Sequence, residues 1–275
     1  MVDSVNLGNV ANNVQFRAKT SKVVNPQIDT DEKVQINGVY VDKKNAMAVI
    51  KNITHPVNMT KPVALDDYKK MLADAGLVEG KDFEVKKFDK AGHAIMLIRS
   101  KDEPDKIIKR VYWRGGEGIE NYDGCTETMY PNNPEIVSIN LQRNPQGRVT
   151  EQTTTYANPD KHKELFPKNI DMSTTAKDYK KILDEQKVKY VVFEDKEVPN
   201  LVVFLEFGSD GKTVVKETNF YDAPDCKDID QYVKNDKGEF VRATHLVKMP
   251  EEGIYNLSVT LSMDEIIRML QTQKK

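Results

Sequence analysis

The six residues DYKKML at positions 67–72 return as DYKKIL at positions 178–183. Each copy is followed by runs of β-branched, aromatic and aliphatic residues, which are typical of strands. A second match follows at nearly the same spacing, because residues 106–113, KIIKRVYW, align with residues 213–220, TVVKETNF. The shared order predicts a structural unit of about 110 residues that occurs twice. The alternative is chance matching in a chain rich in charged residues.

Each hexapeptide lies in a predicted amphipathic helix. The first helix is expected over about residues 62–75, with Leu65, Tyr68 and Leu72 on one face and Gly76 as its stop. The second helix begins after residue 173 and places Tyr179 at the position of Tyr68. A tyrosine at this point could be a binding residue, but it is more simply the anchor of a helix that lies on a sheet.

Strand-like runs follow each helix. They are expected at residues 83–88, 94–99, 107–113 and 136–143, and again at residues 190–193, 201–207, 214–221 and 240–248. Short turns that contain Gly, such as residues 209–212, favour antiparallel hairpins. The predicted fold class is α+β, with two tandem modules, each a helix packed on an antiparallel meander of four or five strands. Residues 262–265, SMDE, form a capping box that predicts a C-terminal capping helix.

Three parts are predicted along the chain. Residues 1–33 lack sustained periodicity and predict a flexible N-terminal arm that is dispensable for folding. Residues 34–150 are expected to form the first module together with a preceding hairpin, whose strands are residues 34–41 and 46–50. Residues 151–275 are expected to form the second module and the closing helix.

The composition is typical of a soluble globular protein. Hydrophobic residues make up 39% of the chain and charged residues 31%, and the formal net charge of −2 gives no overall attraction to nucleic acid or membranes. No stretch approaches the roughly 20 apolar residues of a membrane span, and the N-terminus does not resemble a secretory signal. A cytoplasmic protein is therefore expected. Its two cysteines, Cys125 and Cys226, are too few for a disulfide framework and are expected to be free thiols.

Two acidic loops, at residues 114–128 and 221–231, are the most distinctive candidate sites. Their carboxylates belong to Glu117, Glu120, Asp123, Glu127, Asp222, Asp225, Asp228 and Asp230. Several carboxylates on a loop can surround a calcium ion, although neither loop has the spacing of an EF-hand. The alternative is a set of solvated loop acids, so any cation binding is expected to be weak.

No catalytic residue, cofactor or defined metal site is predicted. Each acidic loop contains a cysteine, but neighbouring carboxylates raise the pKa of a thiol and make it a poor nucleophile. The four histidines are scattered and show no zinc-ligand spacing. Residues 106–114 could place cations and an aromatic ring on one strand face for nucleic acid. The second copy replaces Arg110 with Glu217, however, so a solvated sheet face is the favoured interpretation.

Two functions of different classes remain. The first is a non-enzymatic protein-interaction or structural protein, whose partner is another protein. In this mode the arm contributes a strand through Val14, Phe16 and Arg17, where apolar and polar residues alternate. The alternative is a hydrolase or a divalent-cation-binding protein that uses the acidic loops. The hydrolase requires at least one buried carboxylate with a raised pKa.

Overall fold

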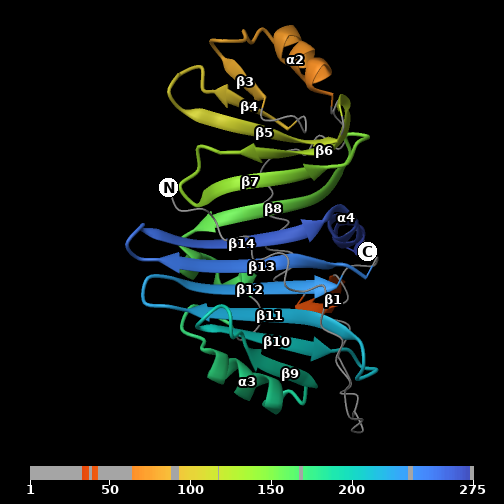
Figure 1. The fold of residues 1–275 in the computed structure, drawn as a ribbon, viewed down its shortest axis with the longest axis vertical. Coiled ribbons are helices and arrows are strands. Elements are labelled where there is room, and N and C mark those ends of the chain that lie inside the picture. The colour runs from red at the N-terminus through yellow and green to blue at the C-terminus, as the bar shows by residue number, and fades with distance from the viewer. Residues whose placement is uncertain are drawn as a thin grey trace.

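The structure is a computed structural model that describes residues 33–36, 39–42, 64–87, 93–116, 118–166, 170–234 and 238–272. Within these ranges, twelve strands form a single antiparallel sheet, and two further strands form a separate hairpin. Figure 1 shows the sheet running the length of the molecule, with α2 and α3 at opposite ends and α4 near the middle. The molecule is therefore organised around one extended sheet.

The sheet consists of two runs of six strands. The first run follows α2 (Leu65–Asp74) and comprises β3 (Phe83–Lys87), β4 (Ala94–Arg99), β5 (Ile107–Gly116), β6 (Gly118–Met129), β7 (Ile136–Arg143) and β8 (Val149–Ala157). The second run follows α3 (Ala176–Glu185) and comprises β9 (Tyr190–Glu194), β10 (Leu201–Phe207), β11 (Val214–Asp222), β12 (Lys227–Lys234), β13 (Phe240–Met249) and β14 (Ile254–Ser262). The last strands of the two runs, β8 and β14, pair in the middle of the sheet.

The predicted antiparallel strands are confirmed, but the predicted α+β class with two modules of four or five strands each is wrong, because the described part of the chain is mostly β and forms one twelve-stranded sheet. Each run has six strands, because β6, β8, β12 and β14 add to the predicted ones. The runs share one sheet, and the expected boundary between residues 150 and 151 falls inside β8. Two separate meanders would leave β8 and β14 as open edges, whereas their pairing satisfies the backbone groups of both strands.

The three predicted helices are confirmed, and a 3-10 helix, η3 (Pro159–Leu165), lies between β8 and α3. Helix α2 is followed by Gly76 with φ of 77°, the left-handed conformation of a helix stop. Helix α4 (Met263–Thr272) begins with the predicted capping box, in which the Ser262 and Glu265 side chains each accept a hydrogen bond from the other residue's backbone N–H. No helix in the described ranges is long and apolar enough to cross a membrane.

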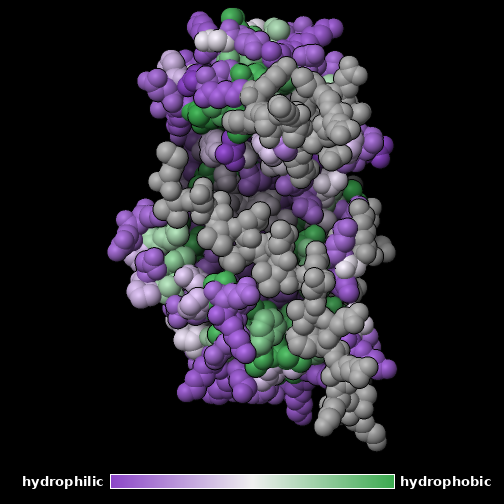
Figure 2. Space-filling model, viewed as in Figure 1, coloured by the Kyte–Doolittle hydropathy of each residue, from purple (hydrophilic) through white to green (hydrophobic). Residues whose placement is uncertain are grey.

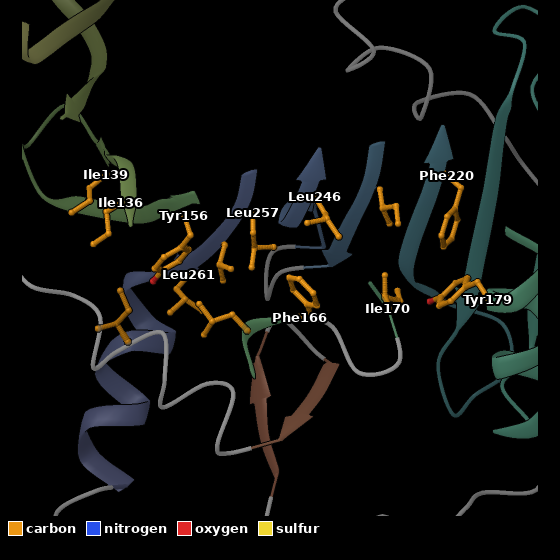
Figure 3. Close-up of a cluster of buried hydrophobic side chains, with 14 of the residues drawn as sticks. Ile136, Ile139, Tyr156, Phe166, Ile170, Tyr179, Phe220, Leu246, Leu257 and Leu261 are labelled. Carbon is orange, nitrogen blue, oxygen red and sulfur yellow. The ribbon is translucent and has the colours of Figure 1, made fainter. Parts of the chain in front are cut away.

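One face of the sheet, here called the helix face, carries the hydrophobic core. At one end, Tyr68 of α2 packs edge-on against Trp113 of β5, and both side chains are fully buried. At the other end, Tyr179 of α3 contacts Phe204 and Phe220. Both tyrosines are therefore buried anchors, as predicted. Figure 3 shows the larger core as a continuous row of side chains from strands of both runs.

The opposite face of the middle strands, here called the polar face, carries hydroxyl and amide side chains. Because side chains alternate along a strand, Thr153 and Thr155 of β8 lie on this face while Tyr156 lies in the core. Their hydroxyls form hydrogen bonds of 2.8 and 2.9 Å with Thr260 and Ser258 of β14. In the view of Figure 2, hydrophilic residues cover most of the coloured surface.

The first predicted strand is divided into two. β1 (Lys33–Ile36) and β2 (Val39–Asp42) pair antiparallel, with Ile36 opposite Val39. The sequence between them is Asn-Gly, the dipeptide that most strongly favours a two-residue hairpin. The expectation of one strand at residues 34–41 is thus wrong, and the expected partner strand at residues 46–50 lies outside the described residues. The predicted arm of residues 1–33 also lies outside them, apart from Lys33, the first residue of β1.

Gly124 of β6 permits a close approach between β6 and β7. Its φ is 115°, and a Cβ atom there would lie 1.9 Å from the carbonyl oxygen of Arg143. We expect Gly124→Ala to lower the free energy of unfolding by roughly 3 kcal/mol or more, because the strands must separate. Gly253→Ala is the matched control, since Gly253 has φ of 67° but no atom lies within 4 Å of the position that its Cβ atom would occupy. Gly253→Ala should lower the free energy of unfolding, as measured by urea denaturation, by only about 1 kcal/mol. Equal losses for both variants would contradict the steric explanation.

Candidate functional site

A cavity of 390 Å³ opens on the polar face, where β8 and β14 join the two runs. Four neighbouring strands line it, with side chains from β7, β8, β14 and β13. The lining residues are Asn140, Glu151, Thr153, Thr155, Arg242, His245, Ser258 and Thr260. Hydroxyl and amide groups can orient a polar ligand, while Arg242 and His245 add charge at one side.

At that side, two aspartates of β12 lie beside Arg242 and His245 of β13. Asp230 stands directly opposite His245 in the strand register. The Nε2 atom of His245 is 3.1 Å from Oδ2 of Asp228, and the Nε atom of Arg242 is 3.0 Å from Oδ1 of Asp230. Asp230 is buried, with 8% of its surface exposed. The four side chains form a compact group, here called the aspartate–histidine cluster.

Two groups in this cluster have shifted pKa values. Burial and the charge of Asp228 raise the pKa of Asp230 to about 6, against the opposing effects of His245 and Arg242. Burial lowers the pKa of His245, but its hydrogen bond to Asp228 and the charges of both aspartates outweigh that effect, so the net shift is upward. Both shifts favour the protonated form of the group concerned.

The Asp230 shift makes stability depend on pH. Its folded-state pKa of about 6 lies above the ordinary value of 3.8, so folding takes up a proton between these pH values. The resulting stabilisation is complete below pH 4 and is lost as the pH rises through 6. We expect the unfolding free energy of the wild type, relative to Asp230→Asn, to fall by up to roughly 3 kcal/mol between pH 4 and pH 7. Urea denaturation at several pH values measures it, and a constant or rising difference would contradict the prediction.

The predicted acidic loops are strand pairs in the structure. β5 and β6 form a hairpin across the first predicted loop, and β11 and β12 cover most of the second. The strand pattern separates the acids, since alternate residues of a strand point to opposite faces. The expectation of two flexible carboxylate loops is therefore wrong. The side chains of Glu117, Glu120 and Asp123 lie outside the described residues.

The remaining acids of the two predicted loops have different surroundings. Glu127 is fully buried on the helix face, where it accepts a hydrogen bond of 3.0 Å from the Tyr68 hydroxyl and pairs with Lys109 at 3.2 Å. Asp222 pairs with Lys227 at 3.7 Å, and Asp225 is exposed. Only Asp228 and Asp230, of those with described side chains, come together as possible metal ligands.

Cys125 and Cys226 are not joined by a disulfide in the structure. Cys125 is buried in β6, and Cys226 is partly buried in the turn before β12. Burial raises the pKa of the Cys226 thiol, and the charges of Asp228 and Asp225 raise it further. This agrees with the expectation that neighbouring carboxylates make the thiol a poor nucleophile.

His245 and Arg242 are the site residues that the sequence does not reveal. They lie in a correctly predicted strand, but their distance from the aspartates along the chain hides their proximity. One signal was available: the alternation of KDIDQYVK at residues 227–234 is typical of a strand and places Asp228 and Asp230 on one face. The residues predicted to donate a strand, Val14, Phe16 and Arg17, lie outside the described residues.

Comparison with protein-family models, with curated proteins and with solved structures found no match to this chain. The function must therefore be inferred from the surfaces and groups described above.

Proposed function

We propose that this chain is a non-enzymatic protein-binding protein, and that its partner adds an extended segment to the edge strand β9. The supporting observation is the contrast between the two edges of the sheet. β9 pairs only with β10 among the described strands, and its sequence YVVFE contains no Lys, Pro or Gly. Its Val192 side chain is 39% exposed. Such an edge lacks the usual protection against pairing with another chain.

The other edge strand, β3, is protected. Its sequence FEVKK carries three charged residues, and Glu84 pairs with Arg99 at 3.1 Å and with Lys86 at 3.6 Å. Charges on an edge, and Lys above all, discourage the addition of a further strand. The partner segment is therefore expected at β9, where main-chain hydrogen bonds would give affinity and the exposed valine would select an apolar residue.

A Lys substitution at the edge tests this proposal. Val192→Lys should remove the captured partner in a pull-down from host lysate, followed by binding measurements with the purified partner. Val137→Lys is the matched control, because Val137 is 41% exposed on the interior strand β7. The control should retain the partner. Recovery of the same partner by both variants, or of no partner by the wild type, would contradict the proposal.

A hydrolase is the second candidate, and one observation favours it. Asp230 is a buried carboxylate whose pKa is raised to about 6, as a general acid or base requires, and its neighbours Arg242 and His245 line the cavity. In a broad screen of hydrolase substrates, any activity of this kind should disappear in Asp230→Asn and persist in Asp222→Asn. No turnover in the screen would count against this candidate.

We also infer that the two runs arose from one duplicated unit. In each run a lysine of the third strand lies over the ring of the helix tyrosine. Lys109 is 5.6 Å from the ring centre of Tyr68, and Lys216 is 5.5 Å from that of Tyr179. The two lysines occupy equivalent positions in the matched segments of residues 106–113 and 213–220. The pairs therefore support common ancestry of the runs.

Each lysine–tyrosine pair has a carboxylate beside it, but the two runs supply this carboxylate from strands that are not equivalent. In the first run the carboxylate belongs to Glu127 of β6, which stands opposite Val111. Val111 aligns with Thr218 of the second run, and the residue opposite Thr218 is Gln231, which has no carboxylate. In the second run it is Glu206 of β10, which stands opposite Lys216 and pairs with it at 3.1 Å.

The first run has Ile98 at the position of Glu206, because Ile98 stands opposite Lys109. Each run thus has one buried carboxylate near its lysine, although the strand that supplies it differs. The side chains of Lys109 and Lys216 are only 16% and 17% exposed, and a charge so largely removed from water needs a partner, so relocation of the acid within a duplicated unit is consistent with this pattern.

The seam between the runs has the register of a two-fold axis. Thr153 of β8 stands directly opposite Thr260 of β14, and the next pairs on either side are Gln152 with Leu261 and Thr154 with Val259. When the two runs are aligned strand by strand through their cross-strand pairs, Thr153 of the first run and Thr260 of the second run occupy the same position. Each strand of the seam thus pairs with the equivalent strand of the other run. The same arrangement occurs at the isologous interface of a symmetric dimer, where the same surface of both subunits meets.

A cytoplasmic location is part of this proposal. It is supported by the lack of a disulfide between Cys125 and Cys226, since disulfides are rare in reducing compartments.

A further inference from the structure

The aspartate–histidine cluster has the geometry of a metal site. One ligand atom from each of Asp228, Asp230 and His245 can be chosen such that all three lie within 4.8 Å of one another. Metal–ligand distances of about 2.0–2.2 Å place the ligand atoms of one ion no more than roughly 4.4 Å apart, so a small movement of these side chains would bring all three atoms within reach of a single ion. The strand register fixes this geometry, since Asp230 and His245 are cross-strand neighbours.

Two further oxygen atoms point to a missing ligand. The Oδ1 atoms of Asp228 and of Asn219 are buried and have no hydrogen-bond partner in the described part of the chain. Asn219 stands directly opposite Asp230 on β11. Its Nδ2 atom donates a hydrogen bond of 2.9 Å to Glu217, which determines the orientation of the amide. Buried oxygen atoms of this kind are normally satisfied by hydrogen bonds or by a cation.

The charges around the cluster also favour a cation. Asp228, Asp230 and the neighbouring Glu217 supply three carboxylates, whereas Arg242 supplies one permanent positive charge. A divalent ion would offset this excess of negative charge. The Arg242 side chain is 46% exposed, so it can turn towards solvent when an ion takes its place beside Asp230.

The geometry points to a binding site for one divalent transition-metal ion, of the zinc type, held by Asp228, Asp230 and His245 at the edge of the cavity. An imidazole nitrogen combined with carboxylate oxygens suits zinc, whereas calcium and magnesium prefer ligand sets made of oxygen alone. Because His245 also lines the cavity, the ion would face it and could accept a fourth ligand from there. This inference is independent of the proposed partner at β9.

Isothermal titration calorimetry of the full chain with zinc chloride at pH 7.5 tests the inference. The expected result is one ion per chain, with any proton still held by the ring nitrogen of His245 released on binding, because imidazole binds zinc only through a deprotonated nitrogen. Repeating the titration in two buffers of different ionisation enthalpy measures the released protons. His245→Gln and Asp228→Asn should each weaken binding at least 10-fold, and calcium should show no comparable binding.

Two control variants exclude other zinc ligands. Cys226→Ser tests the nearby thiol, and Asp222→Asn combined with Asp225→Asn tests the exposed acids of the same hairpin. Both controls should bind zinc as the wild type does. The inference is overturned if the wild type does not bind zinc, if His245→Gln binds it equally well, or if the controls lose it. A zinc-dependent rise in the thermal midpoint, present in the wild type and missing in His245→Gln, confirms that the folded variant lacks the site.

Discussion

Glu127→Gln should lower the free energy of unfolding by about 3–5 kcal/mol, which is the usual cost of breaking a buried ion pair from one side. Glu127 is fully buried, and it pairs with Lys109 at 3.2 Å and with Arg143 at 3.4 Å. The substitution would leave both cations on the helix face without this carboxylate. Urea denaturation followed by circular dichroism measures the loss.

A second substitution should restore part of this stability. Ile98→Glu introduces a carboxylate opposite Lys109, as Glu206 stands opposite Lys216 in the second run. In the Glu127→Gln background it should recover at least about 1 kcal/mol, although Ile98→Glu alone should destabilise the wild type by burying a second acid. A double-mutant cycle without favourable coupling would contradict the relocation of the acid.

Leu257→Ala should lower the free energy of unfolding by about 3–5 kcal/mol and should do so for the whole sheet. Leu257 is fully buried in β14, next to the seam where β14 pairs with β8. The only tryptophan, Trp113, lies in the first run and reports on it by fluorescence. Because the two runs share one sheet, the Trp113 transition should shift as far as the transition seen by circular dichroism.

The control for this prediction is Val137→Ala, which removes an exposed side chain and should cost less than about 0.5 kcal/mol. If Leu257→Ala shifts the circular dichroism transition but leaves the Trp113 transition unchanged, the two runs unfold independently.

The sequence predicts the elements whose own residues determine their conformation. The apolar stripe around Tyr68, the capping box at residues 262–265 and the strand at residues 94–99 all depend on local patterns, and the structure confirms them. The strands β6 and β12 were hidden by their acids. In β12, Asp228 and Asp230 alternate with Ile229 and Gln231, so the acidic residues occupy one strand face and do not form a loop.

The pairing of β8 with β14 could not be predicted from local patterns, because it joins residues about 100 positions apart and depends on which edges remain open after each run has folded. The aspartate–histidine cluster follows from the neighbouring β12–β13 pairing. His245 has no ligand spacing along the chain, and only the strand register brings it to Asp228 and Asp230. A register can be read from a structure, whereas residue spacing alone contains no information about it.

The two-fold register between Thr153 and Thr260 has a kinetic consequence. A half-length ancestor with this seam would assemble as a homodimer, so the concentration of its folded form would depend on how often two chains meet. In the present chain both seam strands belong to one polypeptide, and the same interface closes in a unimolecular step. Its rate is set by loop closure and does not depend on protein concentration. The proposed duplication would thus allow the twelve-stranded sheet to form even when very few copies of the protein are present.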